Sequence, residues 1–155
     1  MKIWYSLLPC LALASCAQQN KLLEVDKFTL RNTEISDQDV PMVRGDQRKH
    51  FYGAVTLEEQ RQRLGQYYTL SWDLTREQNI NNAQPVELIF LYRQGATGAQ
   101  IKRKSYTYNR GVKAGKLEIN IIGDNYLKGG RVLSWRAELR QGKKLITSEE
   151  SYLWK

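Results

Sequence analysis

Residues 66–74 read Gln-Tyr-Tyr-Thr-Leu-Ser-Trp-Asp-Leu, and this stretch decides the fold class. Its apolar side chains at Tyr68, Leu70, Trp72 and Leu74 alternate with mostly polar neighbours. Successive side chains of a β-strand point to opposite faces of the sheet, so a period of two indicates a strand with one buried face. The sequence therefore predicts a half-buried strand here, with the four apolar residues facing the core.

The same alternation recurs along the chain. Further strands are predicted at residues 22–31, 86–92, 101–108, 116–121, 133–140 and 144–154. Both faces of 86–92 are apolar, which predicts a central strand or a covered second face. Lysine and arginine along 101–108 predict an edge strand, because such charges discourage pairing with another chain. Gln141-Gly142-Lys143 gives the clearest hairpin turn. Strands and turns at these spacings predict an all-β antiparallel sandwich in a single domain over 22–155.

The segment between the first two strands lacks the alternation. Residues 32–50 are polar and contain Pro41 and Gly45, which predicts a long loop. A short extended piece is predicted over 50–55. The whole segment, residues 32–65, is longer than a simple connection between two strands needs to be. It is therefore also a candidate interaction surface.

One short helix is predicted within this segment. Thr56 and Glu59 have the spacing of a helix capping box, in which each side chain bonds the backbone of the other residue. Gly65 stands where such a helix would end. These signals predict a helix of two turns over 57–64, and a loop with a few helical turns is the alternative.

The predicted strands resemble those of a known family. Thr69-Leu70-Ser71-Trp72 looks like the tryptophan-bearing B strand of fibronectin type III domains, and residues 87–92 are similar to their C strand. Residues 119–139 resemble the family's passage from strand through glycine-rich loop to strand, with Trp135 in place of the usual tyrosine. The resemblance covers 66–154 and implies a fibronectin type III or immunoglobulin-like sandwich of about seven strands. The 32–65 segment departs from the family pattern.

The chain begins with a short secretory pattern. Lys2 precedes an apolar run over residues 3–14, which ends in Leu13-Ala14-Ser15-Cys16. This run is too short to span a bilayer, which takes roughly 20 apolar residues. It resembles a bacterial lipoprotein signal with its lipobox, which implies a signal peptide over 1–15, lipid on Cys16 and a tether over 16–21. The alternative is an ordinary signal peptide cut near Ala17.

The lipobox resemblance also implies a location. A lipidated Cys16 would hold the protein on a membrane of the bacterial cell envelope. Ala17 follows the cysteine, and by resemblance to Gram-negative lipoproteins a residue other than Asp there implies the outer membrane. In that location a nucleic-acid partner is not expected.

Composition narrows the chemistry. The chain has two cysteines, and Cys10 leaves with the signal while Cys16 takes the lipid, so the folded domain is expected to have no disulfide. Without Lys2, 23 basic residues face 16 acidic ones, a net charge of +7. Such a surface favours phosphate and other anions, and it also serves plain solubility.

Catalysis and metal binding have weak support. His50 is the one histidine, and a hydrolytic triad would need it beside Asp46 or Asp73 and an activated serine, for which no motif exists. Lone histidines in polar loops are mostly surface residues. Zinc ligand sets are absent from the sequence, and neither Asp37-Gln38-Asp39 nor Gly123-Asp124-Asn125 has calcium-loop spacing. We expect no enzymatic activity, no metal and no cofactor.

Basic and aromatic residues gather on one predicted strand and the turn after it. They are Lys102, Arg103, Lys104, Tyr106, Tyr108, Arg110 and Lys113. Lys102, Lys104, Tyr106 and Tyr108 are the candidate ligand-binding residues, because aromatic platforms beside cations suit glycans and anions. An exposed edge strand with cross-strand tyrosines is the alternative interpretation.

Three functions remain open from the sequence. The first is a non-catalytic binding or assembly accessory, anchored through Cys16, whose partner docks on a sheet edge or on 32–65. The second is a carbohydrate- or anion-binding module. The third is an envelope enzyme of unrecognised type.

Overall fold

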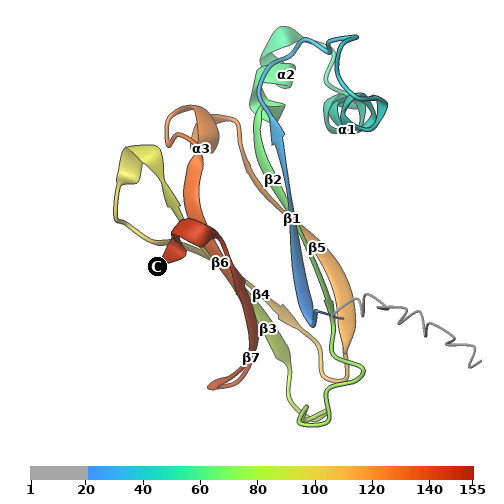
Figure 1. Ribbon diagram of the computed structural model, residues 1–155, viewed down its shortest axis with the longest axis vertical. Coiled ribbons are helices and arrows are strands. Elements are labelled where there is room, and N and C mark those ends of the chain that lie inside the picture. The colour runs from blue at the N-terminus through green and yellow to red at the C-terminus, as the bar shows by residue number, and fades with distance from the viewer. Residues whose placement is uncertain (1–20) are drawn as a thin grey trace, which may run out of the picture.

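The computed structural model describes residues 21–155 as two antiparallel sheets packed face to face (Figure 1). In the first sheet, β2 (Gly65–Asp73) lies between β1 (Leu23–Leu30) and β5 (Ala114–Ile122). The second sheet has the order β4 (Lys102–Tyr108), β3 (Val86–Gln94), β6 (Val132–Gln141) and β7 (Lys144–Glu150). The predicted all-β sandwich is confirmed, with β3 central and β4 at an edge as its residue pattern indicated.

The core lies between the two sheets. Alternate residues of β2 and β3 supply it, and the Tyr68 and Phe90 rings lie 4.9 Å apart across it. Trp135 of β6 packs against the same pair. Each such buried side chain contributes about 1.5–3 kcal/mol to the stability of the folded chain.

Three α-helices accompany the strands: α1 (Pro41–Phe51), α2 (Leu57–Arg63) and α3 (Asp124–Leu127). Two 3-10 turns, Gly95–Thr97 and Tyr152–Trp154, complete the elements. The predicted helix at 57–64 is confirmed as α2. Its capping box forms, since the Thr56 hydroxyl accepts from the Glu59 N–H and the Glu59 carboxylate accepts from the Thr56 N–H. None of the helices in the described residues is long and apolar enough to cross a bilayer.

The predicted loop over 32–50 is wrong in its second half, which is helix α1. Pro41 is the first residue of that helix, where its fixed φ and missing N–H do no harm. Arg48, Lys49 and His50 stand in its last turn, where positive charge suits the helix dipole. The predicted extended piece over 50–55 is wrong for the same reason, because α1 runs through Phe51 and a turn follows.

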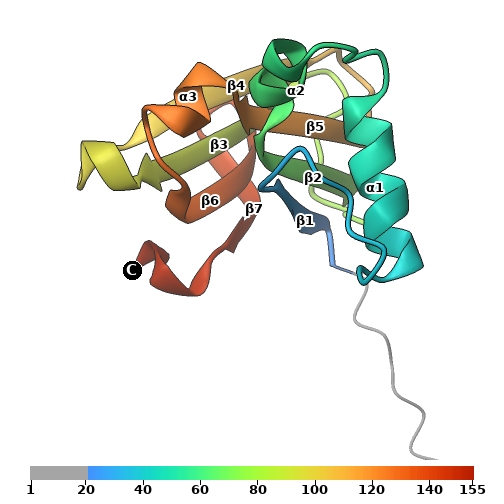
Figure 2. The same ribbon diagram turned by 90° about the horizontal axis from the view of Figure 1, so that it is seen from above.

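Helix α1 covers the outer face of the first sheet, on the side away from the second sheet (Figure 2). His50 holds the contact: its ring stacks on Phe28 at 4.9 Å and meets Tyr67 at 3.9 Å. This cover buries Tyr67, which the strand pattern assigned to the polar face of β2.

The last predicted strand, 144–154, is shorter than expected. Strand β7 ends at Glu150, and the 3-10 turn that follows folds Trp154 back onto Arg93. The Arg93 guanidinium lies 4.4 Å from the Trp154 ring and donates to the Trp154 carbonyl at 3.1 Å. The C-terminal residues are therefore fixed to the sandwich by the contacts of Arg93 with Trp154 and by two hydrogen bonds between Ser151 and the backbone of Trp135.

The strand directions give the sandwich two distinct ends (Figure 1). The chain enters β1 at one end, beside the connections 74–85, 109–113 and 141–144, as the pairing of Leu23 with Trp72 and of Asp73 with Ala114 requires. The other end holds the three α-helices and the C-terminal turn. We call these the entry end and the helical end.

Candidate functional site

A cleft opens between the two sheets at the helical end. Its cavity volume is about 350 Å³. The lining residues come from β1, β2, β6, α3, the C-terminal turn and the loops beside them: Lys27, Thr29, Arg31, Gln66, Tyr126, Arg131, Val132, Leu133 and Leu153. Because several elements meet there, the site depends on the complete sandwich.

Three cations converge on this cleft. Lys27 lies on β1, Arg31 directly follows that strand, and Arg131 directly precedes β6. All three are exposed, and none forms a salt bridge within 4.0 Å with any other described residue. The cleft thus concentrates positive charge with no carboxylate to neutralise it.

The charges affect one another. Partial burial lowers the pKa of Lys27, and the positive charges of Arg131 and Arg31 lower that pKa further. Like charges held together disfavour the charged form of each, and a bound anion would reverse this effect. The cleft is therefore electrostatically prepared for an anion.

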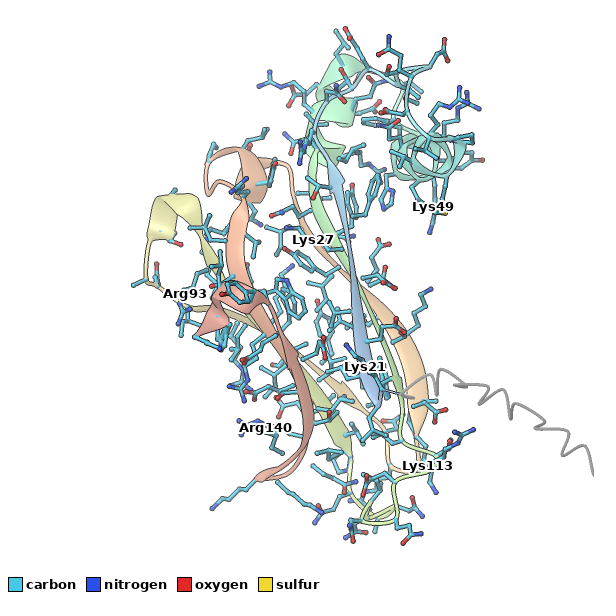
Figure 3. The ribbon with its side chains drawn as sticks, viewed as in Figure 1. Lys21, Lys27, Lys49, Arg93, Lys113 and Arg140 are labelled. Atoms are coloured by element: carbon cyan, nitrogen blue, oxygen red, sulfur yellow. The ribbon has the colours of Figure 1, made fainter. Side chains whose placement is uncertain are left out.

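Local structure explains how Lys27 reaches the cleft. Leu23, Val25 and Lys27 occupy alternate positions on β1, so the lysine continues a core-facing row, and its ammonium lies 5.9 Å from the centre of the Tyr68 ring (Figure 3). At the helical end, the two sheets do not supply enough apolar side chains to fill the space between them. A cation in a core-facing row was the one sequence signal for this site, and our sequence analysis missed it.

The base of the cleft is polar. The Gln66 side-chain carbonyl accepts from the Val132 N–H at 2.6 Å and so joins the two sheets. The fully buried Tyr68 hydroxyl has no hydrogen-bond partner among the described residues. Burial raises the pKa of Tyr68 strongly, and nearby Tyr126 adds to this effect. Tyr68 does not itself line the cleft, and leaving its buried hydroxyl unpaired costs the folded state free energy.

The rim of the cleft is apolar on one side. Leu133 is 45% exposed and Leu153 is 66% exposed, and both line the cleft beside the cations. A ligand with both an anionic group and an apolar part could therefore contact the cations and the two leucines at the same time.

The candidate residues of β4 lie elsewhere. Lys102, Lys104, Tyr106 and Tyr108 share one face of β4, as their spacing implies, and that face is half-buried while the alternate residues are exposed. The Lys102 ammonium donates to the Gln94 side chain at 2.7 Å, and that of Lys104 donates to the Asn120 carbonyl at 2.9 Å. Burial lowers the pKa of Lys104. These two ammonium groups therefore already have partners within the domain.

The two tyrosines also contact the core. Tyr106 and Tyr108 pack against its margin, and the Tyr108 ring lies 4.6 Å from that of Trp72. Burial raises the pKa of Tyr108. The structure does not bring these four residues of β4 to the cleft, and their role in ligand binding stays a prediction.

His50 occupies a different environment from the surface loop expected for it. It lies on α1 with its side chain 9% exposed, and its Nδ1 is 2.7 Å from the Asp46 carbonyl oxygen. Its Nε2 lies 3.8 Å from a Glu118 carboxylate oxygen. Asp73, the other carboxylate considered for a triad, bonds Thr75 instead. Within residues 21–155, no group of three or more His, Cys, Asp or Glu side chains could hold a metal ion.

Cys16, the candidate lipidation residue, lies outside the described residues, as do the predicted signal peptide and most of the tether. Comparisons with protein-family models, with curated proteins and with solved structures find no match for this chain. Assignment of a function therefore depends on the geometry of the domain itself.

Proposed function

We propose that this protein is a lipid-anchored domain of the bacterial cell envelope that acts by binding rather than by chemistry, and that the cleft at the helical end binds an anionic ligand. The observation that carries the proposal is the convergence of Lys27, Arg31 and Arg131 without an acidic partner among the described residues. The anchor rests on the lipobox resemblance at Cys16. The fibronectin-like relationship likewise remains a proposal, which the two-sheet arrangement supports.

Anion binding follows from the donors present. Two guanidinium groups and one ammonium offer charge-assisted hydrogen bonds, which are shorter and stronger than neutral ones. A phosphate or carboxylate would relieve the mutual repulsion of the three cations. The envelope supplies both groups on lipids and acidic glycans, and the apolar rim at Leu133 and Leu153 adds room for a less polar part.

A binding measurement tests this site. Inorganic phosphate would be titrated into the mature protein, and the side-chain and amide resonances followed by NMR. The expected result is a set of shifts around Lys27 and Arg131, together with a rise in the Lys27 pKa as the anion binds. The double variant Lys27→Gln/Arg131→Gln should weaken phosphate binding at least roughly tenfold, since each lost charge-assisted bond is worth about 1.5–3 kcal/mol before solvent screening.

A matched control comes from α1. Arg48 and Lys49 are exposed, and neither lines the cleft; Figure 3 shows Lys49 on α1, outside the space between the sheets. Arg48→Gln/Lys49→Gln removes the same charge and should leave phosphate binding unchanged. Equal binding by the two double variants would reject the cleft as the binding site.

Binding of a protein partner is the second candidate function, and the exposed apolar side chains of the segment 32–65 favour it. Exposed apolar side chains gather there: Met42 is 77% exposed, Tyr52 87%, Val55 86% and Leu57 74%. Exposed apolar side chains are typical of interaction sites where they form one patch. In a crosslinking experiment on intact envelopes, a stoichiometric partner should be lost with Met42→Ser/Leu57→Ser and kept with Leu145→Ser, a 41% exposed control on β7.

A further inference from the structure

The entry end of the sandwich carries a second concentration of positive charge. It consists of residues 21–22, 74–85, 109–113 and 141–144, which the strand pairing brings together. Figure 3 shows Lys21 and Lys113 at this end. Its basic residues are Lys21, Arg76, Arg110, Lys113, Lys143 and Lys144; Glu77 lies among them, and the exposed Asp73 borders them at the end of β2.

These basic side chains are accessible. Only Lys113 is partly buried, and the other five are exposed. Among the described residues, Lys21 pairs with Glu149 at 3.1 Å and Lys144 donates to the Asn79 carbonyl at 3.2 Å. Arg76, Arg110 and Lys143 form no salt bridge with any described residue. The charges of Arg110 and Lys143 therefore remain available to a partner, whereas Arg76 lies near Asp73 and, after the hydrogen bonds from Thr75, helps to lower the pKa of that carboxyl.

The helical end differs in charge balance. Its loops and helices, residues 31–64, 95–101, 123–131 and 151–155, hold nine basic and seven acidic side chains. The excess of basic charge is therefore concentrated at the end where the chain enters the domain.

The position of Cys16 indicates what the basic residues of the entry end would contact. Seven chain steps separate Cys16 from Leu23, and even a fully extended chain spans at most about 25 Å over that distance. A lipid on Cys16 would keep the entry end within that distance of the leaflet, close enough for direct contact. Anionic phospholipids attract nearby lysine and arginine by about 1 kcal/mol for each residue at the surface.

We propose that the entry end is a membrane-docking surface that rests on anionic phospholipid headgroups of the leaflet in which the Cys16 lipid is inserted. This inference depends on the anchor in the proposed function and is independent of the cleft. It also sets the direction of the cleft, because the eight residues of β1 span about 25 Å from the entry end toward Lys27 and Arg31. In this orientation the helical end lies farthest from the membrane, with Lys27 about halfway along β1 and Arg31 just beyond its end.

An orientation measurement tests the docking surface. The lipidated protein would be reconstituted in vesicles of phosphatidylcholine, with or without phosphatidylglycerol, and labelled with a fluorophore on the thiol of Asn82→Cys at the entry end or of Gln38→Cys at the helical end. Both positions are exposed. Headgroup-attached nitroxides should quench the label at position 82 and not at position 38, more strongly with phosphatidylglycerol present and less at high salt.

Two charge-reversed variants complete the design. Arg110→Glu/Lys143→Glu should abolish the effect of phosphatidylglycerol on quenching, since the loss of two surface cations alone weakens contact on the order of 30-fold. Arg48→Glu/Lys49→Glu makes the same change of net charge on α1 and should leave the quenching intact. Equal quenching at positions 82 and 38, or quenching that does not depend on phosphatidylglycerol, would overturn the inference.

The lipid anchor and the docking surface can be tested separately. A mature protein that does not float with pure phosphatidylcholine vesicles would disprove the anchor. Its flotation with phosphatidylglycerol vesicles then tests the surface alone: binding lost in Arg110→Glu/Lys143→Glu and kept in the α1 control would support docking, and no binding by the unaltered protein would refute it.

Discussion

His50 shows how one side chain can attach a whole helix. It is packed between Phe28 and Tyr67, and its Nδ1 reaches the backbone of its own helix at Asp46. We expect His50→Ala to lower the free energy of unfolding by about 1–3 kcal/mol through lost aromatic packing and burial. Urea denaturation would measure this loss. Amide exchange should increase most over α1, and unchanged exchange there would show that other contacts hold the helix.

Gly115 is required by a neighbouring side chain rather than by its backbone conformation. A Cβ at this position would lie 2.4 Å from the Trp72 indole, which packs across the glycine. Gly115→Ala should therefore destabilise the domain by about 1–3 kcal/mol. Trp72→Ala, which empties the same place, should cost about 3–5 kcal/mol. Both values come from thermal or chemical unfolding followed by circular dichroism.

A second glycine supplies the control for this prediction. Gly45 lies within α1, and a Cβ there meets no atom of the described residues within 4 Å. Gly45→Ala should stabilise the domain by roughly 0.5–1 kcal/mol, because alanine suits a helix interior better. If Gly115→Ala were as well tolerated, the register of β2 against β5 would need revision.

The residues buried between the two sheets could be predicted from the sequence, whereas those buried between α1 and the outer face of the first sheet could not. Tyr68, Leu70 and Trp72 follow the period of two and are buried as expected. Tyr67 and His50 are buried only because α1 packs on the outer face of β2, a contact that no local pattern encodes. Lys27 is the converse case: its core-facing position could be read from the sequence, but the incomplete closure of the sandwich above it could not.

At the scale of elements, strands and helices differ in how clearly the sequence marks them. All seven strands were predicted from the sequence, several of them from alternating patterns, and α2 has its capping box. Helix α1 buries only Gln47 fully, so no apolar stripe marks it, and Pro41 and Gly45 suggested a loop. A helix that packs mainly through one histidine and one glutamine leaves little apolar periodicity to detect.

The capping box of α2 makes a separate prediction. None of the described residues of α2 is buried, so its cap supports a local structure with little packing behind it. We expect Thr56→Ala to remove about 1 kcal/mol of helix stability, seen as faster amide exchange at Gln60 and the residues after it. The global unfolding midpoint should hardly change. A large drop in that midpoint would mean that α2 is coupled to the sandwich core.

For the molecule as a whole, we expect the tyrosines with raised pKa values to limit stability at alkaline pH. Burial raises the pKa of Tyr67 to about 12, and it raises those of Tyr68, Tyr92 and Tyr108 as well. A raised pKa means that the folded state favours the neutral phenol. Its contribution to stability is complete below the ordinary pKa of 10 and is lost as the pH rises through the folded value.

The domain should therefore keep its stability up to about pH 10 and lose it progressively between pH 10 and 12, where an unfolded chain would release protons that the folded chain retains. Denaturant unfolding at a series of pH values measures this loss, and phenolate absorbance follows the ionisation. Tyr67→Phe loses the bond that its hydroxyl donates to the Arg63 carbonyl at 2.6 Å, but it should reduce the dependence of stability on pH in this range. Tyr52→Phe, at a side chain that is 87% exposed, should leave that dependence unchanged. If both variants lost stability as steeply as the unaltered protein, Tyr67 would not contribute to the loss of stability at alkaline pH.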